Sequence, residues 1–236
     1  EVAQPRGNRV PGLFGAPGVL GHAGHDRSPH HGLAADNGAQ PPAKAQIEGF
    51  YTYETAGLPE QPVLRYHVQL PPEYDPHRRY PCLVTLHSAG ATARSQIDWW
   101  AGPYDPKARM RYGQAARRGY IVIAPEWTKE HQRVYEFSAR EHANTLFALR
   151  DALKRFSIDV DKVFLSGHSM GGDAAWDIGL SHPDLWAGVL PFVAQADKYI
   201  SRYKENGRLL PMYFVAGEKD GARWINNASD WDRYLS

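Results

Sequence analysis

Apolar and polar positions first alternate regularly in residues 63–70. Four apolar side chains there fall on one face of an extended segment: Leu64, Tyr66, Val68 and Leu70. Since successive side chains of a strand point to opposite faces, this period of two predicts a half-buried strand. A proline-rich turn covers residues 71–81, and the mostly apolar run 82–86 predicts an interior strand of a parallel sheet.

Helices are predicted between such strands. Ser138, with Glu141 three residues later, has the form of a capping box that starts a helix. That helix carries an apolar face made of Ala143, Leu146, Leu149, Leu153 and Phe156. Asp105-Pro106 has the form of an N-cap followed by a proline at the first helical position, and Gly119 follows two arginines. A helix is therefore also predicted over residues 106–118.

The alternation of strands and helices continues toward the end of the chain. Further strands are predicted over 120–124, 162–165, 187–193 and 212–216, and further helices over 171–181 and 200–206. Alternating strands and helices with short connections are typical of a parallel sheet covered by helices on both faces. The predicted fold class is therefore α/β, with a mostly parallel, doubly wound sheet.

Residues 1–46 lack any such pattern. They are rich in Gly, Pro, His and Ala, and we expect a disordered tail or linker followed by one domain over residues 47–236. The tail places four histidines near Asp26, namely His22, His25, His30 and His31. Their spacing matches no closed set of metal ligands, so a solvated stretch is favoured over a metal site.

The charge and composition of the chain do not favour a nucleic-acid or membrane partner. The chain has 27 Lys and Arg against 26 Asp and Glu, and this balance favours no nucleic-acid partner. No run of about 18 apolar residues is present, so no membrane span or membrane partner is predicted. Cys82 is the single cysteine and is expected to be a small buried hydrophobe.

The strongest chemical signal is the GxSxG string at residues 167–171. It lies between a predicted strand and a predicted helix. A chain that reverses so sharply has no room for side chains at Gly167 and Gly171, and it holds Ser169 in a strained backbone conformation beside His168. Ser169 is therefore predicted to be a nucleophile. The N–H of Met170, at the helix N-terminus, is predicted to be the first donor to an oxyanion.

The segment that follows the strand at 82–86 is the second candidate for oxyanion binding. His87-Ser88-Ala89-Gly90 looks like a variant of the His-Gly-Gly type of oxyanion loop, with Ser88 in the place of a glycine. The backbone N–H of Ser88 or of Ala89 is expected to be the second donor. The ring of His87 is expected to pack under the loop rather than to transfer protons.

Two aspartates are candidates for an acid that orients a catalytic histidine. Asp220 lies just past the predicted strand at 212–216, in a turn that contains glycine, and is favoured. Asp197, after the preceding strand, is the alternative. Either residue is otherwise a solvated aspartate in a turn.

Together these residues resemble the α/β-hydrolase superfamily over residues 63–236, in particular its polyhydroxybutyrate-depolymerase-like, feruloyl-esterase-like and prolyl-oligopeptidase-like branches. The resemblance implies a serine hydrolase that cleaves carboxylic esters through an acyl-enzyme on Ser169, with no cofactor. It also implies the chain order serine, acid, histidine. Only residues 221–236 follow Asp220 and none is a histidine. The hydrolase domain is therefore expected to be truncated, with its last strand, last helix and catalytic histidine beyond Ser236.

The sequence leaves alternatives for the catalytic base and for the reaction. His131, His142, His168 and His182 are each weak candidates for the base. The favoured substrate is a small-molecule or glycan-linked ester, but the same residues cleave peptides in the prolyl-oligopeptidase-like branch. A catalytically inactive binding domain is the alternative of another class. Four aromatic residues near predicted strand ends are expected to pack in loops, with stacking on a substrate ring as the alternative: Trp99, Trp100, Tyr104 and Trp127.

Overall fold

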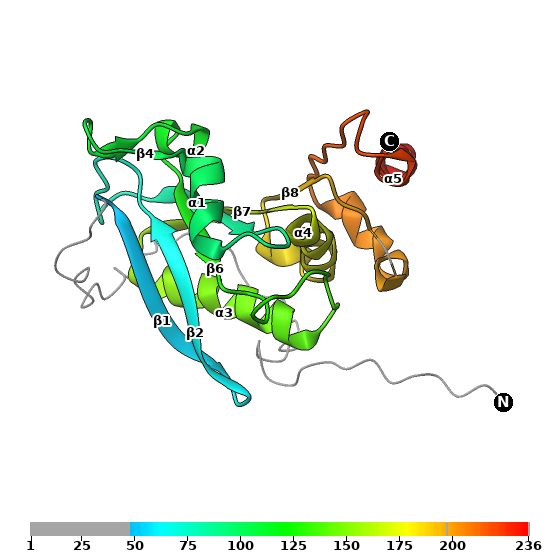
Figure 1. Ribbon diagram of the computed structural model, residues 1–236, viewed down its shortest axis with the longest axis horizontal. Helices are drawn as coiled ribbons and strands as arrows, with labels where there is room; N and C mark the ends of the chain where they lie inside the picture. Colours follow the sequence, from blue (N-terminus) through cyan, green and yellow to red (C-terminus); the bar gives the residue numbers. More distant parts are fainter. Residues whose placement is uncertain (1–47, 197, 236) are drawn as a thin grey trace, which may run out of the picture. The chain divides into compact units, whose positions relative to one another are not determined.

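The computed structural model describes residues 48–196 and 198–235. At its centre is a six-stranded sheet with the order β1-β2-β6-β3-β7-β8 (Figure 1). The strands are β1 (Phe50–Leu58), β2 (Gln61–Gln69), β3 (Tyr80–Leu86), β6 (Ile121–Pro125), β7 (Ile158–His168) and β8 (Gly188–Phe192). Strands β6, β3, β7 and β8 are parallel, whereas β2 is antiparallel to both β1 and β6. The predicted α/β fold with a mostly parallel sheet is confirmed.

The remaining elements connect these strands. The α-helices are α1 (Ala93–Ala101), α2 (Gln114–Arg117), α3 (Ala139–Arg155), α4 (Met170–Ser181) and α5 (Ala222–Leu235). The 3₁₀ helices among the described residues are η1 (Pro183–Leu185), η2 (Lys198–Arg202) and η3 (Lys204–Leu209). A small ribbon pairs β4 (Tyr104–Asp105) with β5 (Met110–Arg111). Within the described part of the chain, no helix combines the length and the apolar character needed to cross a membrane.

Helices α1 and α3 cover opposite faces of the sheet. Phe50 of β1 packs in a buried cluster with Ile97 of α1. Tyr53, three residues further along β1, meets the ring of Phe156 at the end of α3, with 5.7 Å between the ring centroids. Positions separated by an odd number of residues lie on opposite faces of a strand. The two helices therefore pack on different sides (Figure 1).

Burial and capping follow the sequence pattern at several points. The side chains of Leu64, Tyr66 and Val68 are fully buried in β2. Ser138 caps α3, because its N–H donates to the Glu141 carboxylate at 2.8 Å while its side chain accepts from the Glu141 N–H. The predicted capping box is confirmed. The predicted alternation of buried and exposed positions holds as far as Tyr66, but His67 and Gln69 on the opposite face are also buried, so the second half of β2 is buried on both faces. Cys82 is also buried, and burial raises the pKa of its thiol, as expected of an inert small hydrophobe.

The helix predicted over residues 106–118 is wrong, because the β4–β5 ribbon and the short α2 take its place. The carboxylate of Asp105 accepts from the Lys107 N–H at 2.8 Å, so it closes a tight turn instead of capping a helix. The backbone after β5 is also held in place, because Gly113 packs closely against Gly102. A Cβ on Gly113 would lie only 2.2 Å from the backbone nitrogen of Gly102.

Two more predicted elements differ in the structure. Residues 212–216 form no continuous strand, although parallel bridges join Val189 to Met212 and Phe192 to Val215. The helix predicted over 200–206 is replaced by η2 and η3. The tail predicted over residues 1–46, with its histidines and Asp26, lies outside the described residues. So does Asp197.

Candidate active site

Ser169 lies at the junction between β7 and α4, where the chain reverses direction. Its φ is 53° and its ψ is −120°, a conformation that costs free energy for a residue with a side chain. The Ser169 N–H donates to the carbonyl oxygen of Phe192 at 2.9 Å, which ties the turn to the end of β8. The serine side chain is consequently half-buried at the carboxyl end of the parallel strands.

The glycines around Ser169 are required by lack of space. A Cβ on Gly167 would lie 1.9 Å from the carbonyl oxygen of Gly171. A Cβ on Gly171 would lie 2.2 Å from the carbonyl oxygen of Leu86 and 2.8 Å from that of His87. The first turn of α4 therefore lies directly against the end of β3 and the start of the loop that follows it.

That loop, residues 87–90, forms a tight turn beside the helix N-terminus. The Ser88 carbonyl accepts from the Ala91 N–H at 3.1 Å, and Gly90 has a φ of 78°, as the third residue of such a turn often requires. The N–H of Met170, in the first turn of α4, has no acceptor within the helix. The structure thus brings the Ser88 and Ala89 segment and the N-terminus of α4 to the same end of the sheet.

The His87 ring is buried under this loop. Its Nδ1 lies 3.0 Å from the Ser88 carbonyl oxygen, and its ring centroid lies 5.6 Å from that of Trp127. Burial lowers the pKa of His87, so the imidazole is held in its neutral form. Trp127 is itself fully buried and belongs to the core.

A cavity of about 260 Å³ opens at Ser169. Its lining includes Met170, Asp173, Arg133, Gln195 and Arg223. Asp173 accepts the Gln195 N–H at 2.9 Å, which links α4 to the segment after β8. Of these residues, only Met170 was predicted from the sequence. Only Asp173 carried a local signal, because a residue four positions after Ser169 shares its helix face.

Asp220 lies in the turn before α5, within electrostatic range of His168. Its Oδ2 accepts the Gly217 N–H at 2.6 Å. Burial lowers the pKa of His168, and the negative charge of Asp220 opposes that shift. The His168 ring stacks on Trp99, with 4.8 Å between the centroids. The carboxylate therefore approaches the elbow from the side of His168.

The structure does not bring a described histidine to the serine. Within residues 48–196 and 198–235, the Ser169 hydroxyl forms no hydrogen bond. His142 instead contacts Asp177, His182 packs against the His142 ring, and the exposed His131 lies 3.3 Å from Glu130. Nor do the described residues hold a cluster of three His, Cys, Asp or Glu side chains that could bind a metal ion.

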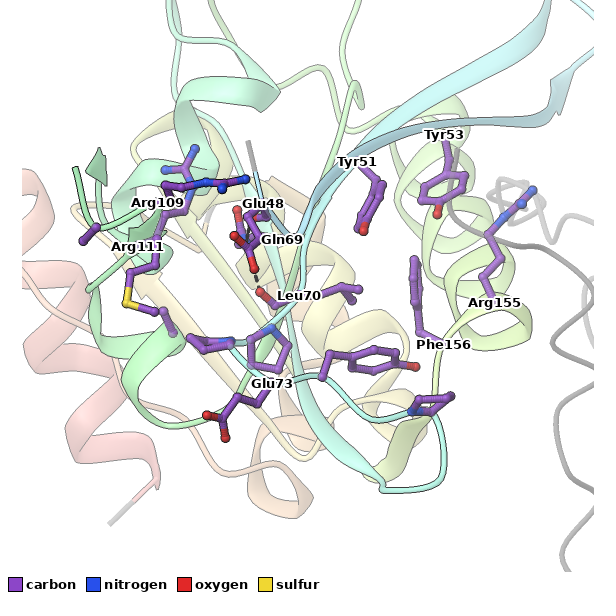
Figure 2. Close-up of a pocket in the computed structure, with 18 residues that line it drawn as sticks. Glu48, Tyr51, Tyr53, Gln69, Leu70, Glu73, Arg109, Arg111, Arg155 and Phe156 are labelled. Atoms are coloured by element: carbon purple, nitrogen blue, oxygen red, sulfur yellow. Dashed lines mark hydrogen bonds between the residues drawn. The ribbon is translucent and has the colours of Figure 1, made fainter. Parts of the chain in front are cut away.

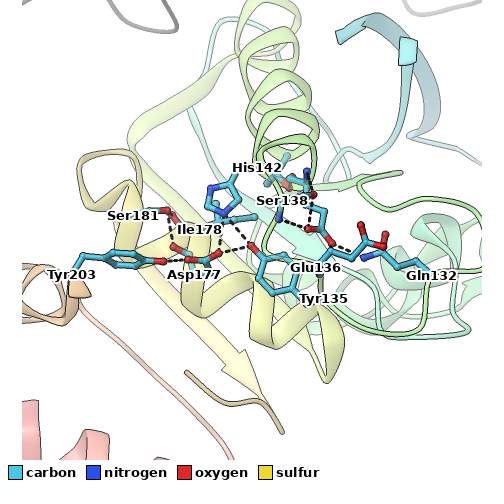
Figure 3. Close-up of polar contacts among 11 residues, drawn as sticks. Gln132, Tyr135, Glu136, Ser138, His142, Asp177, Ile178, Ser181 and Tyr203 are labelled. Atoms are coloured by element: carbon cyan, nitrogen blue, oxygen red, sulfur yellow. Dashed lines mark hydrogen bonds and ion pairs between the residues drawn. The ribbon is translucent and has the colours of Figure 1, made fainter. Parts of the chain in front are cut away.

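Asp177 is the centre of a buried polar network behind the cavity (Figure 3). Its Oδ2 accepts from Tyr135 Oη at 2.6 Å and lies 3.0 Å from His142 Nε2 of α3, and its Oδ1 accepts from the hydroxyl of Tyr203. The contact between His142 and Asp177 places α4 on the same side of the sheet as α3. Since Tyr135 also lines the cavity at Ser169, this network supports one wall of the site.

Figure 2 shows a larger cavity. Its volume is about 790 Å³, and Ser169 is not part of its lining. It lies where β1 begins and β2 ends, and its lining includes Tyr51, Tyr53, Tyr74 and Phe156. Arg155 covers the Tyr53 ring, with its guanidinium carbon 4.8 Å from the centroid. None of the residues predicted from the GxSxG string or the 87–90 loop lines this cavity, so the larger volume does not mark the candidate active site.

No protein-family model matches the chain. Among solved structures, a thermostable esterase matches with a TM-score of 0.60 and 20% identity over 80% of this chain and 52% of the esterase. The feruloyl esterase module from Clostridium thermocellum, complexed with sinapinate, matches with a TM-score of 0.57 and 15% identity, over 83% and 75% of the two chains. An S-formylglutathione hydrolase from Staphylococcus aureus has a TM-score of 0.55 and 18% identity, over 79% and 82%.

The similarity of this chain to these solved structures is a similarity of fold. The chain spans about half the length of the thermostable esterase and larger shares of the other two proteins. At 15–20% identity, the matches show that the chain has the α/β-hydrolase fold. One fold of this kind hosts many reactions, so the chemistry has to be inferred from the site.

Proposed function

We propose that this chain with the α/β-hydrolase fold is a serine hydrolase that cleaves carboxylic esters, with Ser169 as its nucleophile. The observation that carries this function is the strained backbone of Ser169, with φ of 53°, at a helix N-terminus and in the wall of a cavity. Strain of this kind persists where the surroundings enforce it, and such residues cluster at functional sites. The esterases among the structural neighbours support an ester as the substrate.

The reaction proceeds in two halves. Ser169 Oγ attacks the ester carbonyl carbon while a general base takes the hydroxyl proton, and the C=O bond opens to an oxyanion. The N–H groups of Met170 and of Ser88 or Ala89 would donate to that oxyanion. The carbon–oxygen bond to the alcohol then breaks, and the alcohol leaves with the proton from the base. Water attacks the acyl-enzyme in the same way and releases the acid.

We assign the base to a histidine outside residues 48–196 and 198–235, oriented by Asp220. This assignment is supported by the absence of any hydrogen bond between the Ser169 hydroxyl and a histidine of the described residues. It is also supported by the position of Asp220 on the His168 side of the elbow, within electrostatic range of that ring. A neutral histidine held by a carboxylate is the usual partner of a serine nucleophile.

The first test is hydrolysis of p-nitrophenyl acetate by the full natural protein and by its Ser169→Ala variant. We expect kcat to fall by about 10⁴-fold or more, because no other group replaces the nucleophile. Ser181→Ala is the matched control, since Ser181 lies on the same helix and its hydroxyl donates to backbone carbonyls of that helix, those of Asp177 and Ile178. That variant is expected to keep the wild-type rate.

Retention of the wild-type rate in Ser169→Ala would refute the assignment of the nucleophile. An aminoacyl p-nitroanilide distinguishes ester from peptide cleavage. Faster turnover of the anilide than of the ester would identify a peptidase. Turnover of neither substrate by the folded wild-type protein would favour a binding domain.

A further inference from the structure

Arg133 lies between the 87–90 loop and the cavity at Ser169. It belongs to the connection between β6 and α3 and lines the cavity together with Ser169. A Cβ on Gly90 would lie 3.0 Å from its Nη1, so the guanidinium lies beside the last residue of that loop. A positive charge therefore stands at the edge of the candidate oxyanion site.

The backbone on both sides of Arg133 is fixed by buried groups. Gln132 Nε2 donates to the Glu141 carboxylate at the start of α3 and to the carbonyl oxygen of Val134 at 2.8 Å. Tyr135 is buried and donates to Asp177. Because the loop is already ordered, binding of a ligand by Arg133 has to restrain only its side chain.

Carboxylates of the same connection are bound to other groups. Glu136 pairs with Lys129 at 2.9 Å, and Glu130 lies 3.3 Å from His131. Arg133 itself forms no ion pair or hydrogen bond with any residue in the described part of the chain. The cavity lining holds two guanidinium groups, those of Arg133 and Arg223, and the single carboxylate of Asp173. The local charge therefore favours an anionic ligand.

We infer that Arg133 determines substrate specificity by binding a carboxylate carried by the ester substrate, within reach of the carbonyl that Ser169 attacks. This role rests on the ester hydrolysis proposed above. A guanidinium binds a carboxylate through two parallel hydrogen bonds, which gives both attraction and orientation. The substrate class is then esters with a second, negatively charged group, such as half-esters of short dicarboxylic acids.

The test compares charged and neutral esters in the full natural protein. Mono-p-nitrophenyl succinate places the carboxylate on the acyl side and 4-acetoxybenzoate places it on the alcohol side. p-Nitrophenyl butyrate and methyl 4-acetoxybenzoate are their neutral partners. We expect Arg133→Gln to lower kcat/KM about tenfold for at least one charged ester and less than twofold for both neutral esters. The effect is moderate because the side chain is exposed to solvent.

Two further variants sharpen the comparison. Arg133→Lys is expected to recover part of the loss, since it restores the charge without the planar fork. Arg79→Gln removes an exposed arginine just before β3, at the opposite end of that strand from the 87–90 loop, and is expected to change none of the rates. The wild-type preference for the charged ester is also expected to shrink as NaCl is raised, because salt screens the attraction.

Equal losses on charged and neutral esters in Arg133→Gln would overturn this role and make the residue a structural support. If the folded wild-type protein hydrolyses no ester at all, the proposed function fails, and Arg133 is judged by binding alone. Succinanilic acid, the amide analogue of a succinate half-ester, is then titrated against Ser169→Ala protein. Equal affinity with and without Arg133 would overturn the specificity role.

Discussion

Gly171 and Gly119 illustrate two different reasons for a glycine. Gly119 has a φ of 71° and nothing within 4 Å of where a Cβ would stand, so only its backbone conformation requires glycine. Gly171 lies in the first turn of α4, and there a Cβ would overlap the carbonyl oxygen of Leu86. The overlapping atom belongs to the backbone of a central strand and has little freedom to move.

Gly171→Ala is expected to lower the free energy of unfolding by about 2–3 kcal/mol, because α4 has to move away from β3. Ester hydrolysis should be lost, since the same movement separates Ser169 from the 87–90 loop. Gly119→Ala, with backbone strain only, should cost about 1 kcal/mol and leave activity unchanged. Urea unfolding and p-nitrophenyl acetate assays measure both effects. Helix propensity alone predicts that Gly171→Ala stabilises the protein by about 1 kcal/mol, so a stabilised variant would contradict the contact.

Some residues of the candidate site could be predicted from the sequence and others could not. Ser169 and its glycines were predictable because a sharp turn between strand and helix has a local signature. Arg133 and Gln195 were not, since each reaches the cavity from a connection whose position depends on distant contacts. For Arg133, the deciding contacts are those of Tyr135 with Asp177 and of Gln132 with Glu141.

At the scale of elements, Asp177 joins three segments that the sequence separates. Tyr135 precedes α3, His142 is on α3, and Tyr203 stands between η2 and η3, and all three contact this one carboxylate of α4 (Figure 3). Burial, followed by the charge of Asp177, raises the pKa of Tyr135 and keeps its hydroxyl protonated as a donor. The 3₁₀ segments are thereby bound to the domain through a polar contact as well as through packing.

Asp177→Ala is expected to cost about 3 kcal/mol of stability, because the buried Tyr135 and the partly buried His142 and Tyr203 lose their common acceptor. Tyr203→Phe removes a single donor and is expected to cost about 1 kcal/mol. Thermal unfolding of both variants against wild type measures the difference. Equal effects of the two substitutions would show that Asp177 does not act as the shared acceptor.

The elements were predictable where local pattern and tertiary contacts agree. The capping box of α3 is local and appears as expected, and the apolar face of β2 is buried as expected. The other face of β2 is exposed only in its first half, because tertiary contacts also bury His67 and Gln69. The helix predicted over residues 106–118 was wrong. The close approach of Gly102 and Gly113 and the turn at Asp105 override a helix-like sequence there. Residues 212–216 are apolar enough for a strand, yet only two bridges form with β8.

At the scale of the whole molecule, the sequence predicted parallel strands and covering helices, but not which strands are neighbours. Placing β6 between β2 and β3 depends on how α1 and α3 divide the two faces, which follows from packing rather than from any single segment. The same packing buries titratable groups. Of the histidines that the structure describes, four have a pKa lowered first by burial: His67, His87, His168 and His182.

We expect these histidines to make the stability of the domain depend on pH. His67 shows the largest effect, because burial and the charges of Arg94 and Arg65 lower its pKa to about 4, even though Glu126 lies 3.8 Å from its Nε2. In the unfolded chain the same group has a pKa of about 6.5. Between these two values the unfolded chain binds more protons, so the free energy of unfolding falls as the pH falls.

We therefore expect stability to be highest above about pH 6.5 and to decrease as the pH is lowered from 6.5 toward 4, with a slope of at most about 1.4 kcal/mol per pH unit from one such histidine. His67→Gln should flatten this dependence. His131→Gln removes an exposed histidine and serves as the matched control. Urea midpoints measured at several pH values between 4.5 and 7.5 provide the comparison. Parallel curves for wild type and His67→Gln would mean that the His67 ring is already solvated in the folded protein.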